Sequence, residues 1–301
     1  MNRRDFLISN AMAAAAVGLS ASEVFSAGNS SQAAAPMVKK SLKWGMVKGD
    51  MSVLDKFKML KDIGFDGVEL DSPNDLPMKE ILNARDKTGL ELPGTVNSAH
   101  WKSPLSDRDP AKRKVCFDAM VQALRDTKKY GGTTVLLVPG VVNAETSYQE
   151  AWDRSITEVK KLIPVVEETG IKIAFENVWN NFLLSPIEAA RYVDEFNHPL
   201  IGWYFDVGNI LRYGWPVHWI EVLGKRIFKL DIKEFSLKKM NEEGLWKGFG
   251  VELMEGDCNW PAVNDALRKI GYSGWASAEV PGGDRARLTV IKERMDGIFK
   301  A

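Results

Sequence analysis

Short apolar runs of strand length alternate along the chain with longer segments in which apolar residues recur at helical spacing. After the first run, Val53, Phe57 and Leu60 recur at this spacing, and Gly64 ends the segment. The run at 134–138 is apolar throughout, as expected for a parallel strand that is buried on both faces. The strand-length runs lie at residues 42–46, 67–70, 92–97, 134–138, 171–177, 201–206, 226–231 and 275–279.

This alternation predicts an α/β protein with a single (β/α)8 barrel, the TIM-barrel fold. A doubly wound open sheet is the competing architecture, but eight uninterrupted strand–helix units favour a closed barrel. The segment 235–257 is rich in Gly and Lys and is too long to be a simple connector. We therefore expect it to be a loop that serves as an active-site lid.

Four consecutive predicted strands end on an acid: Glu176, Asp206, Asp231 and Glu279. The carboxyl ends of all barrel strands face one rim, so these side chains are expected to lie close together. Crowded carboxylates repel one another unless a cation neutralises them. Ligation by oxygen alone favours Mn2+, Mg2+ or Ca2+ over zinc. The pattern predicts one metal site, although any single acid could instead cap a helix or pair with Lys or Arg.

Five further residues are candidates for substrate binding. His100 follows the third strand and Lys233 lies two residues beyond Asp231, so both could reach a substrate oxygen. A packed, hydrogen-bonded His and a solvated Lys are the alternatives. Asn177 and Asn209 could orient metal ligands or bind hydroxyl groups, or cap the helices that follow. Arg285 follows two glycines at a helix start, where it could hold an anionic group or lie on the surface.

Composition excludes several classes of protein. Lys and Arg together number 40, as do Asp and Glu, so no basic surface for nucleic acid is expected. The two cysteines, Cys116 and Cys258, have no C-x-x-C spacing, which argues against a thiolate zinc site and leaves a disulfide undecided. Trp101, Trp179 and Trp215 lie near predicted loop starts, where they could stack on a sugar or simply pack.

The N-terminus is expected to be an export signal rather than part of the barrel. Arg3 and Arg4 precede the apolar stretch 11–19, a pattern typical of a twin-arginine signal, and small residues follow as far as Ala35. The apolar stretch is too short to cross a bilayer as a conventional helix, so no stable membrane anchor is expected once the signal is removed. We expect residues 1–35 to be the leader and residues 36–301 to be a periplasmic barrel domain.

Three motifs resemble those of the xylose-isomerase-like barrels known as sugar phosphate isomerases/epimerases, which include ketose 3-epimerases and hydroxypyruvate isomerases. They are Phe175-Glu176-Asn177, Phe205-Asp206-Val207-Gly208-Asn209 and Ala278-Glu279. The resemblance implies a divalent metal, usually Mn2+ or Mg2+, held by Glu, Asp, His and Glu at the ends of strands five to eight. Here the usual His-x-Lys-Asp stands as Asp231-Ile232-Lys233-Glu234, and a frequent second His is Asn209. With these changes the site becomes more anionic and harder, which favours Mn2+ or Mg2+.

The resemblance further implies that Glu176 and Glu279 are both ligands and an acid/base pair. One would remove a proton from the carbon beside the carbonyl of a keto sugar, and the other would return it through an enediolate. The expected activity is that of a sugar isomerase or epimerase. A lyase or glycoside-cleaving enzyme acting by β-elimination, and a non-catalytic carbohydrate-binding barrel with a structural metal, are the alternatives. The expected partner is a small carbohydrate, and the sequence leaves a homo-oligomer open.

Overall fold

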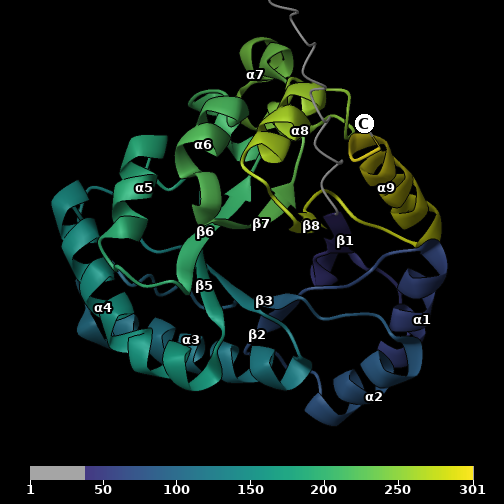
Figure 1. The fold of residues 1–301 in the computed structure, drawn as a ribbon, viewed down its shortest axis with the longest axis horizontal. Helices are drawn as coiled ribbons and strands as arrows, with labels where there is room; N and C mark the ends of the chain where they lie inside the picture. Colours follow the sequence, from purple (N-terminus) through teal and green to yellow (C-terminus); the bar gives the residue numbers. More distant parts are fainter. Residues whose placement is uncertain (1–37, 301) are drawn as a thin grey trace, which may run out of the picture. The chain divides into compact units, whose positions relative to one another are not determined.

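Eight parallel strands form one sheet in the order β1-β8-β7-β6-β5-β4-β3-β2. The computed structural model describes residues 38–300, so the predicted export signal lies outside the described residues. Figure 1 shows the strands at the centre with helices around them. The strands are β1 Val38–Leu42, β2 Leu70–Ser72, β3 Gly94–Asn97, β4 Thr134–Leu137, β5 Lys172–Glu176, β6 Ile201–Asp206, β7 Ile227–Ile232 and β8 Gly274–Ala278.

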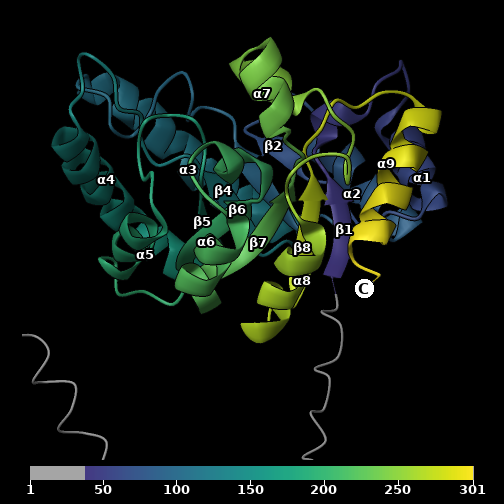
Figure 2. The ribbon, with the colours of Figure 1, turned by 90° about the horizontal axis from the view of Figure 1, so that it is seen from above.

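The helices connect successive strands, as a (β/α)8 barrel requires. In Figure 2, α7 lies beyond the end toward which strand β8 points. The α-helices are α1 Val53–Ile63, α2 Met78–Thr88, α3 Pro110–Tyr130, α4 Tyr148–Thr169, α5 Pro186–Asp194, α6 Pro216–Leu223, α7 Leu237–Glu243, α8 Trp260–Lys269 and α9 Arg285–Ile298. Short 3-10 helices are η1 Trp44–Met46, η2 Gly208–Arg212, η3 Gly224–Arg226 and η4 Leu245–Phe249.

The sheet closes on itself between the first and second strands. β1 pairs in parallel with β8 along its whole length. On its other side, Leu42 O accepts a hydrogen bond of 2.9 Å from Glu69 N, and Trp44 N donates one of 2.8 Å to Glu69 O. These backbone bonds join β1 to the residues that precede β2. The predicted closed (β/α)8 barrel is therefore confirmed.

The first strand begins earlier than the apolar pattern indicated. It was expected at 42–46, but β1 ends at Leu42 and residues 44–46 form η1. Two lysines hid this strand from the pattern. Lys39 Nζ lies 5.2 Å from the Trp275 ring centroid, and Lys40 Nζ lies 2.9 Å from an Asp296 oxygen. Such side chains cover apolar neighbours with their methylene groups while their charges reach solvent, so they occupy strand positions that look polar.

The segment 235–257 is not the irregular loop that was expected. It contains α7 and η4, and no residue of α7 is buried. Leu237 and Met240 are its only apolar residues, too few to form a stripe that hydrophobic periodicity could identify. The N-cap of α7 is Ser236, whose side chain accepts from the backbone N–H of Lys239.

Local signals account well for the longer helices. The Ser147 hydroxyl accepts a hydrogen bond from Glu150 N, while the Glu150 carboxylate accepts one from Ser147 N, and together they form a capping box at the start of α4. Gly170 ends the same helix at φ 71°, a left-handed conformation that glycine adopts without strain. Pro164 lies inside this helix, as the sequence indicated.

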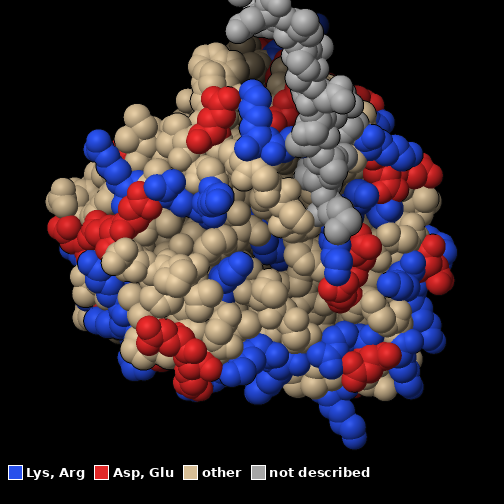
Figure 3. All heavy atoms as spheres, viewed as in Figure 1, with Lys and Arg blue, Asp and Glu red and all other residues tan. Residues whose placement is uncertain are grey.

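The surface and the cysteines fit the composition. Figure 3 shows Lys and Arg side chains interspersed with Asp and Glu on one face, in keeping with a formal net charge of zero. Cys116 and Cys258 are both buried and free, so they form no disulfide with each other.

Among residues 38–300, no helix combines the length and the apolar character that crossing a membrane requires.

The capping box predicts a measurable loss of stability. Replacing Ser147 by Ala removes the acceptor for Glu150 N, so the free energy of unfolding should fall by about 1 kcal/mol. Ser147→Asp keeps an acceptor at this position and should lose less. Urea unfolding followed by circular dichroism measures the stability of both variants. A Ser147→Ala variant as stable as the wild type would contradict the role of this cap.

Candidate metal centre

Four acidic side chains meet at the carboxyl ends of neighbouring strands. Glu176 and Asp206 are the last residues of β5 and β6, Asp231 lies one residue before the end of β7, and Glu279 directly follows β8. One carboxylate oxygen from each lies within 4.8 Å of the others. Parallel pairing places Asp206 beside Asp231 in register. The structure thus brings together all four acids that the strand ends indicated.

Two lysines lie among these acids. Lys233 Nζ is 2.9 Å from Asp206 Oδ2 and 3.5 Å from Glu279 Oε2. Lys43 Nζ is 2.9 Å from Asp231 Oδ1. Lys233 was among the candidates, whereas Lys43 was not. The one available signal for Lys43 was a charged residue inside an otherwise apolar run, which by itself does not distinguish a site residue from a solvated one.

The pKa values of the acids follow from burial and from these neighbours. Burial, followed by the charges of Glu279 and Asp231, raises the pKa of Glu176 well above its usual range. Burial also raises the pKa of Asp231 to about 7, although Lys43 acts in the opposite direction. For Glu279, burial is outweighed by Lys233 and Lys43, and the pKa is lowered. Without a further cation, the quartet is therefore not fully ionised at neutral pH.

The oxygen atoms of the quartet fit a hard dication. Both Asp231 oxygens are buried and accept no hydrogen bond among residues 38–300, and Oδ1 is the oxygen that lies 2.9 Å from the Lys43 ammonium group. Asp206 Oδ2 and Glu279 Oε2 are also buried and have no hydrogen bond among the described residues, and they lie 2.9 Å and 3.5 Å from the Lys233 ammonium group. Buried carboxylate oxygens without partners are costly, and an all-oxygen set suits Mn2+ or Mg2+. Glu176, Asp206, Asp231 and Glu279 would hold such an ion.

Two asparagines fix the ends of β5 and β6 relative to each other. The Asn177 side chain accepts from Asp206 N and from Trp203 Nε1, and it donates to Asp206 O at 2.7 Å. Asn209 N donates to Asp206 Oδ1 at 2.8 Å, and its side-chain amide donates to Asn177 O. Most of these contacts bear on Asp206 or on the strand that carries it, and the last one joins Asn209 to the residue after β5. Asn177 therefore has an orienting role, while Asn209 also faces the cavity described next.

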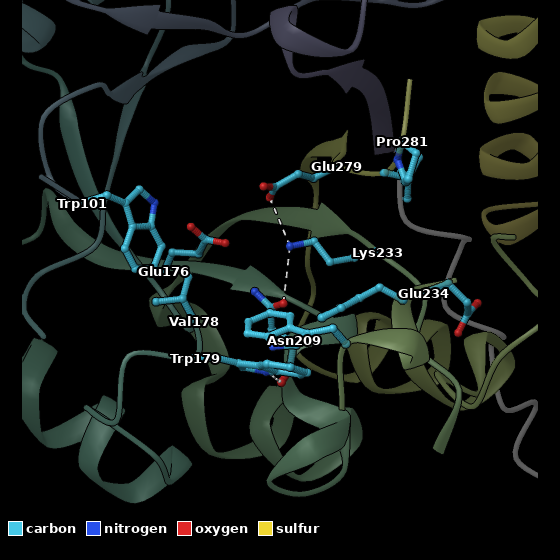
Figure 4. A pocket seen from close by; sticks show the side chains of 12 residues that line it. Trp101, Glu176, Val178, Trp179, Asn209, Lys233, Glu234, Glu279 and Pro281 are labelled. Atoms are coloured by element: carbon cyan, nitrogen blue, oxygen red, sulfur yellow. Dashed lines mark hydrogen bonds and ion pairs between the residues drawn. The ribbon is translucent and has the colours of Figure 1, made fainter. Parts of the chain in front are cut away.

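A cavity of about 510 Å³ opens beside the carboxylates. Figure 4 shows Glu176, Glu279 and Lys233 directed into it, while the Glu234 carboxylate points away. Trp101 and Trp179 line it, as a sugar-stacking role would require, whereas Trp215 does not. The lining residues are Trp101, Glu176, Val178, Trp179, Asn209, Lys233, Glu234, Trp246, Phe249, Glu279, Val280 and Pro281.

The segment 235–257 forms an aromatic wall of this cavity. Trp246 and Phe249, both in η4, lie 4.8 Å and 4.9 Å from the Trp179 ring, centroid to centroid. The buried Glu234 carboxylate fastens the segment, because it accepts from Met254 N at 2.7 Å and from other donors. Glu234 was quoted in the strand-seven motif but not predicted as an anchor. Its partners lie up to 26 positions away in sequence, so no local signal indicated them.

The remaining candidates lie in different places. His100 is buried, and its Nδ1 accepts a hydrogen bond of 3.3 Å from Val138 N. The imidazole is thus a packed, hydrogen-bonded group, and Nε2 is the nitrogen left to carry a proton. Arg285, at the start of α9, is exposed, and its guanidinium Nη1 lies 3.7 Å from the Asp62 Oδ2 atom of α1. It is not among the residues that line the cavity.

Comparison with known proteins places these features in context. A model of the family described as "Xylose isomerase-like TIM barrel" matches residues 57–300. L-ribulose-5-phosphate 3-epimerase from Escherichia coli O1:K1 is 24% identical over 262 residues, covering 80% of this chain and 89% of that protein. Two solved structures are similar in fold. D-allulose 3-epimerase from Methylomonas sp., with D-allulose bound, has a TM-score of 0.67 at 16% identity, covering 85% and 90% of the two chains. The 3-keto-D-glucoside 4-epimerase from E. coli has a TM-score of 0.72 at 14% identity, covering 88% and 100%.

Burial of His100 predicts a pH-dependent loss of stability in the metal-free protein. Burial lowers the pKa of His100 to about 4, whereas an unfolded His titrates near 6.5. Between these values the unfolded chain binds the extra proton, so His100 makes the folded state progressively less stable as pH falls from about 6.5 to about 4, by roughly 3 kcal/mol at the lower limit. His100→Asn should remove this component.

Urea unfolding of chelator-treated protein at several pH values measures this effect as the difference between wild type and variant. The exposed His218→Asn provides a matched control, because the same substitution there should leave the pH profile unchanged. Parallel profiles for wild type and His100→Asn would contradict the predicted contribution.

Proposed function

The chain belongs to the xylose isomerase-like TIM barrel family, and we propose that it is a divalent-metal-dependent sugar isomerase or epimerase. The reaction would take place at the carbon beside the carbonyl of a keto sugar or keto-sugar derivative, through an enediolate. Mn2+ or Mg2+ is the proposed ion, held by Glu176, Asp206, Asp231 and Glu279. The relatives that are sugar epimerases support this class of activity.

One observation carries the metal dependence. Fully ionised, the four acids bear four negative charges and the two lysines that contact them two positive ones, which leaves a charge of −2. A single dication balances that charge. The buried Asp231 Oδ2, which accepts no hydrogen bond among the described residues, supports a ligand at this point.

The cavity supports an unphosphorylated sugar. Lys233 is the one cationic side chain among the lining residues, and its ammonium group is already paired with Asp206 and Glu279. A phosphate group binds tightly where free cations or backbone N–H groups converge, and the described lining offers no such free cation. The aromatic residues that share the lining can stack on the apolar face of a sugar ring.

The chain's own residues divide the chemistry among them. Glu176 and Glu279 both line the cavity, and in this proposal one removes the proton from the carbon while the other delivers a proton to it. Lys233, whose ammonium group lies 3.5 Å from Glu279, also lines the cavity and can stabilise negative charge on a substrate oxygen. When bound, the metal would supply further electrostatic stabilisation of the enediolate oxygens. Neither the lyase nor the non-catalytic alternative is favoured by a specific observation in the described residues.

The site of action is a separate proposal. The twin-arginine pattern at Arg3 and Arg4 supports export of the folded protein to the periplasm, with residues 1–35 removed. A cofactor-binding protein suits this route, because the signal directs export after folding. Small, unphosphorylated carbohydrates are the substrates expected there.

Proton removal from carbon predicts solvent exchange. The Mn2+-loaded protein, incubated in deuterated water with a panel of keto sugars, should incorporate deuterium beside the carbonyl of its substrate. Glu279→Gln should lower the exchange rate by about 10²-fold or more, because it removes one of the two proton carriers. Mass spectrometry of the recovered sugar measures the exchange.

Glu255→Gln provides a control, since Glu255 is an exposed residue paired with Arg294. The Glu255→Gln variant should incorporate deuterium into the sugar at the wild-type rate. Wild-type rates in Glu279→Gln would remove this residue from the proposed proton transfer. An absence of exchange with every sugar, in wild type that binds Mn2+, would favour the non-catalytic alternative.

A further inference from the structure

Lys43 contacts one acid of the carboxylate quartet but does not line the substrate cavity. It follows β1 directly, its side chain is 14% exposed, and it is not among the residues that line the cavity. Its Nζ lies 2.9 Å from Asp231 Oδ1 and 2.9 Å from Glu69 Oε2. The proposed function gives Lys43 no task, since it reaches an acid of the quartet rather than the space for substrate.

The two oxygens of Asp231 have different surroundings. Oδ1 lies 2.9 Å from the Lys43 ammonium group, while Oδ2 is buried and accepts no hydrogen bond in the described part of the chain. One oxygen is therefore occupied, and the other is left for a ligand. The Lys43–Asp231 pair also has a formal charge of zero. The pair therefore offers one oxygen atom to a metal ion and adds no net charge to that of the other three acids.

Lys43 is itself held in place from behind. Glu69 Oε2 also accepts a hydrogen bond of 2.7 Å from the Tyr204 hydroxyl, and the other Glu69 oxygen is paired with the buried Lys229. The Lys43 ammonium group lies 4.5 Å from the Tyr204 ring centroid, within cation–π distance. Backbone hydrogen bonds at Leu42 and Trp44 fix the residues on either side of Lys43 to Glu69. The ammonium group therefore cannot move away from Asp231 without breaking several contacts.

We propose that Lys43 is a positioning residue that makes Asp231 a one-oxygen, charge-neutralised ligand for a single divalent cation. Lys43 occupies Oδ1 and thereby directs Oδ2 toward the other three acids. Lys43 also offsets the negative charge of Asp231, so that a single dication is enough to balance the charge of the site. This inference rests on the proposed metal site, but it does not depend on which sugar is the substrate or on whether the sugar is turned over.

Metal affinity provides a test in which charge and positioning act in opposite directions. Charge alone would make Lys43→Met bind Mn2+ more tightly, because a cation is removed from beside the site. If Lys43 positions Asp231, the variant should bind Mn2+ about 10-fold to 100-fold more weakly, as is typical when a residue that orients a ligand is lost. Isothermal titration of chelator-treated full-length protein with Mn2+ measures the dissociation constant.

The control is Lys39→Met, the same substitution four residues earlier, at a lysine whose charge pairs with the exposed Glu91. It should bind Mn2+ as the wild type does. Glu69 retains Lys229 and Tyr204 in Lys43→Met, which favours folding of the variant. Circular dichroism and thermal unfolding check the fold, and Lys43→Gln, which keeps a donor for Oδ1 without a charge, serves if Lys43→Met fails to fold.

A double variant tests the pairing itself. In Asp231→His the ammonium group loses its carboxylate, so Mn2+ binding should weaken. In Lys43→Met with Asp231→His, a neutral imidazole replaces the neutral pair, so binding should recover relative to Asp231→His, with a shift in preference from Mn2+ toward Zn2+. Such a rescue would not follow from a purely structural role of Lys43, because the double variant carries both substitutions.

The outcomes separate this inference from the proposed function. Unchanged or tighter Mn2+ binding by folded Lys43→Met, or a double variant that is weaker by the product of the two single effects, would overturn the positioning role and leave the metal site in place. Wild-type protein that binds no Mn2+ or Mg2+ would overturn both. Weaker binding by Lys43→Met together with rescue by the double variant is the result expected.

Discussion

Repulsion among buried carboxylates is the constraint on which the rest of this site depends. Two like charges about 4 Å apart repel by roughly 4 kcal/mol at an effective dielectric constant of about 20. Four acids with ligand atoms within 4.8 Å of one another cannot all remain ionised on these terms. Lys43 and Lys233 offset part of the charge, while burial and then the remaining repulsion raise the pKa values of Glu176, Asp206 and Asp231. A bound dication would remove the remainder, so folding, protonation and metal binding would be linked at this one place.

The barrel holds the acids in this unfavourable arrangement because three of them lie in strands and Glu279 directly follows one. Parallel register sets Asp206 beside Asp231, and Asn177 joins the end of β5 to the backbone of Asp206. The aromatic wall is likewise fixed, since Glu234 fastens the segment that carries η4. Sites carried on rigid elements keep their geometry without help from the substrate. The cavity is therefore largely formed before a ligand enters.

Features that depend on the order of residues along the chain could be predicted from the sequence. Strand-length apolar runs identified the barrel, and an acid at the end of four successive runs identified the quartet, because parallel strands bring equivalent ends together. Pairings between distant parts of the chain could not be found in this way. Lys39 and Lys40 concealed the start of β1, and α7 carries no apolar stripe. Glu234 resembles a motif residue in sequence, but only the fold reveals that it holds a distant segment.

Barrel closure explains why a residue near the start of the chain can act on an acid near its end. β1 lies between β8 on one side and the residues before β2 on the other, so Lys43 emerges where both neighbours are fixed. From there its ammonium group reaches Asp231 of β7 and Glu69, the residue just before β2 whose backbone is bonded to that of Leu42 and Trp44. A carboxylate in the third ligand position would carry one negative charge more than an imidazole, and a lysine from the first strand offsets it. In the proposed site, the carboxylate at strand seven would suit a single dication because the lysine that follows strand one supplies a compensating charge, and barrel closure brings the two positions together.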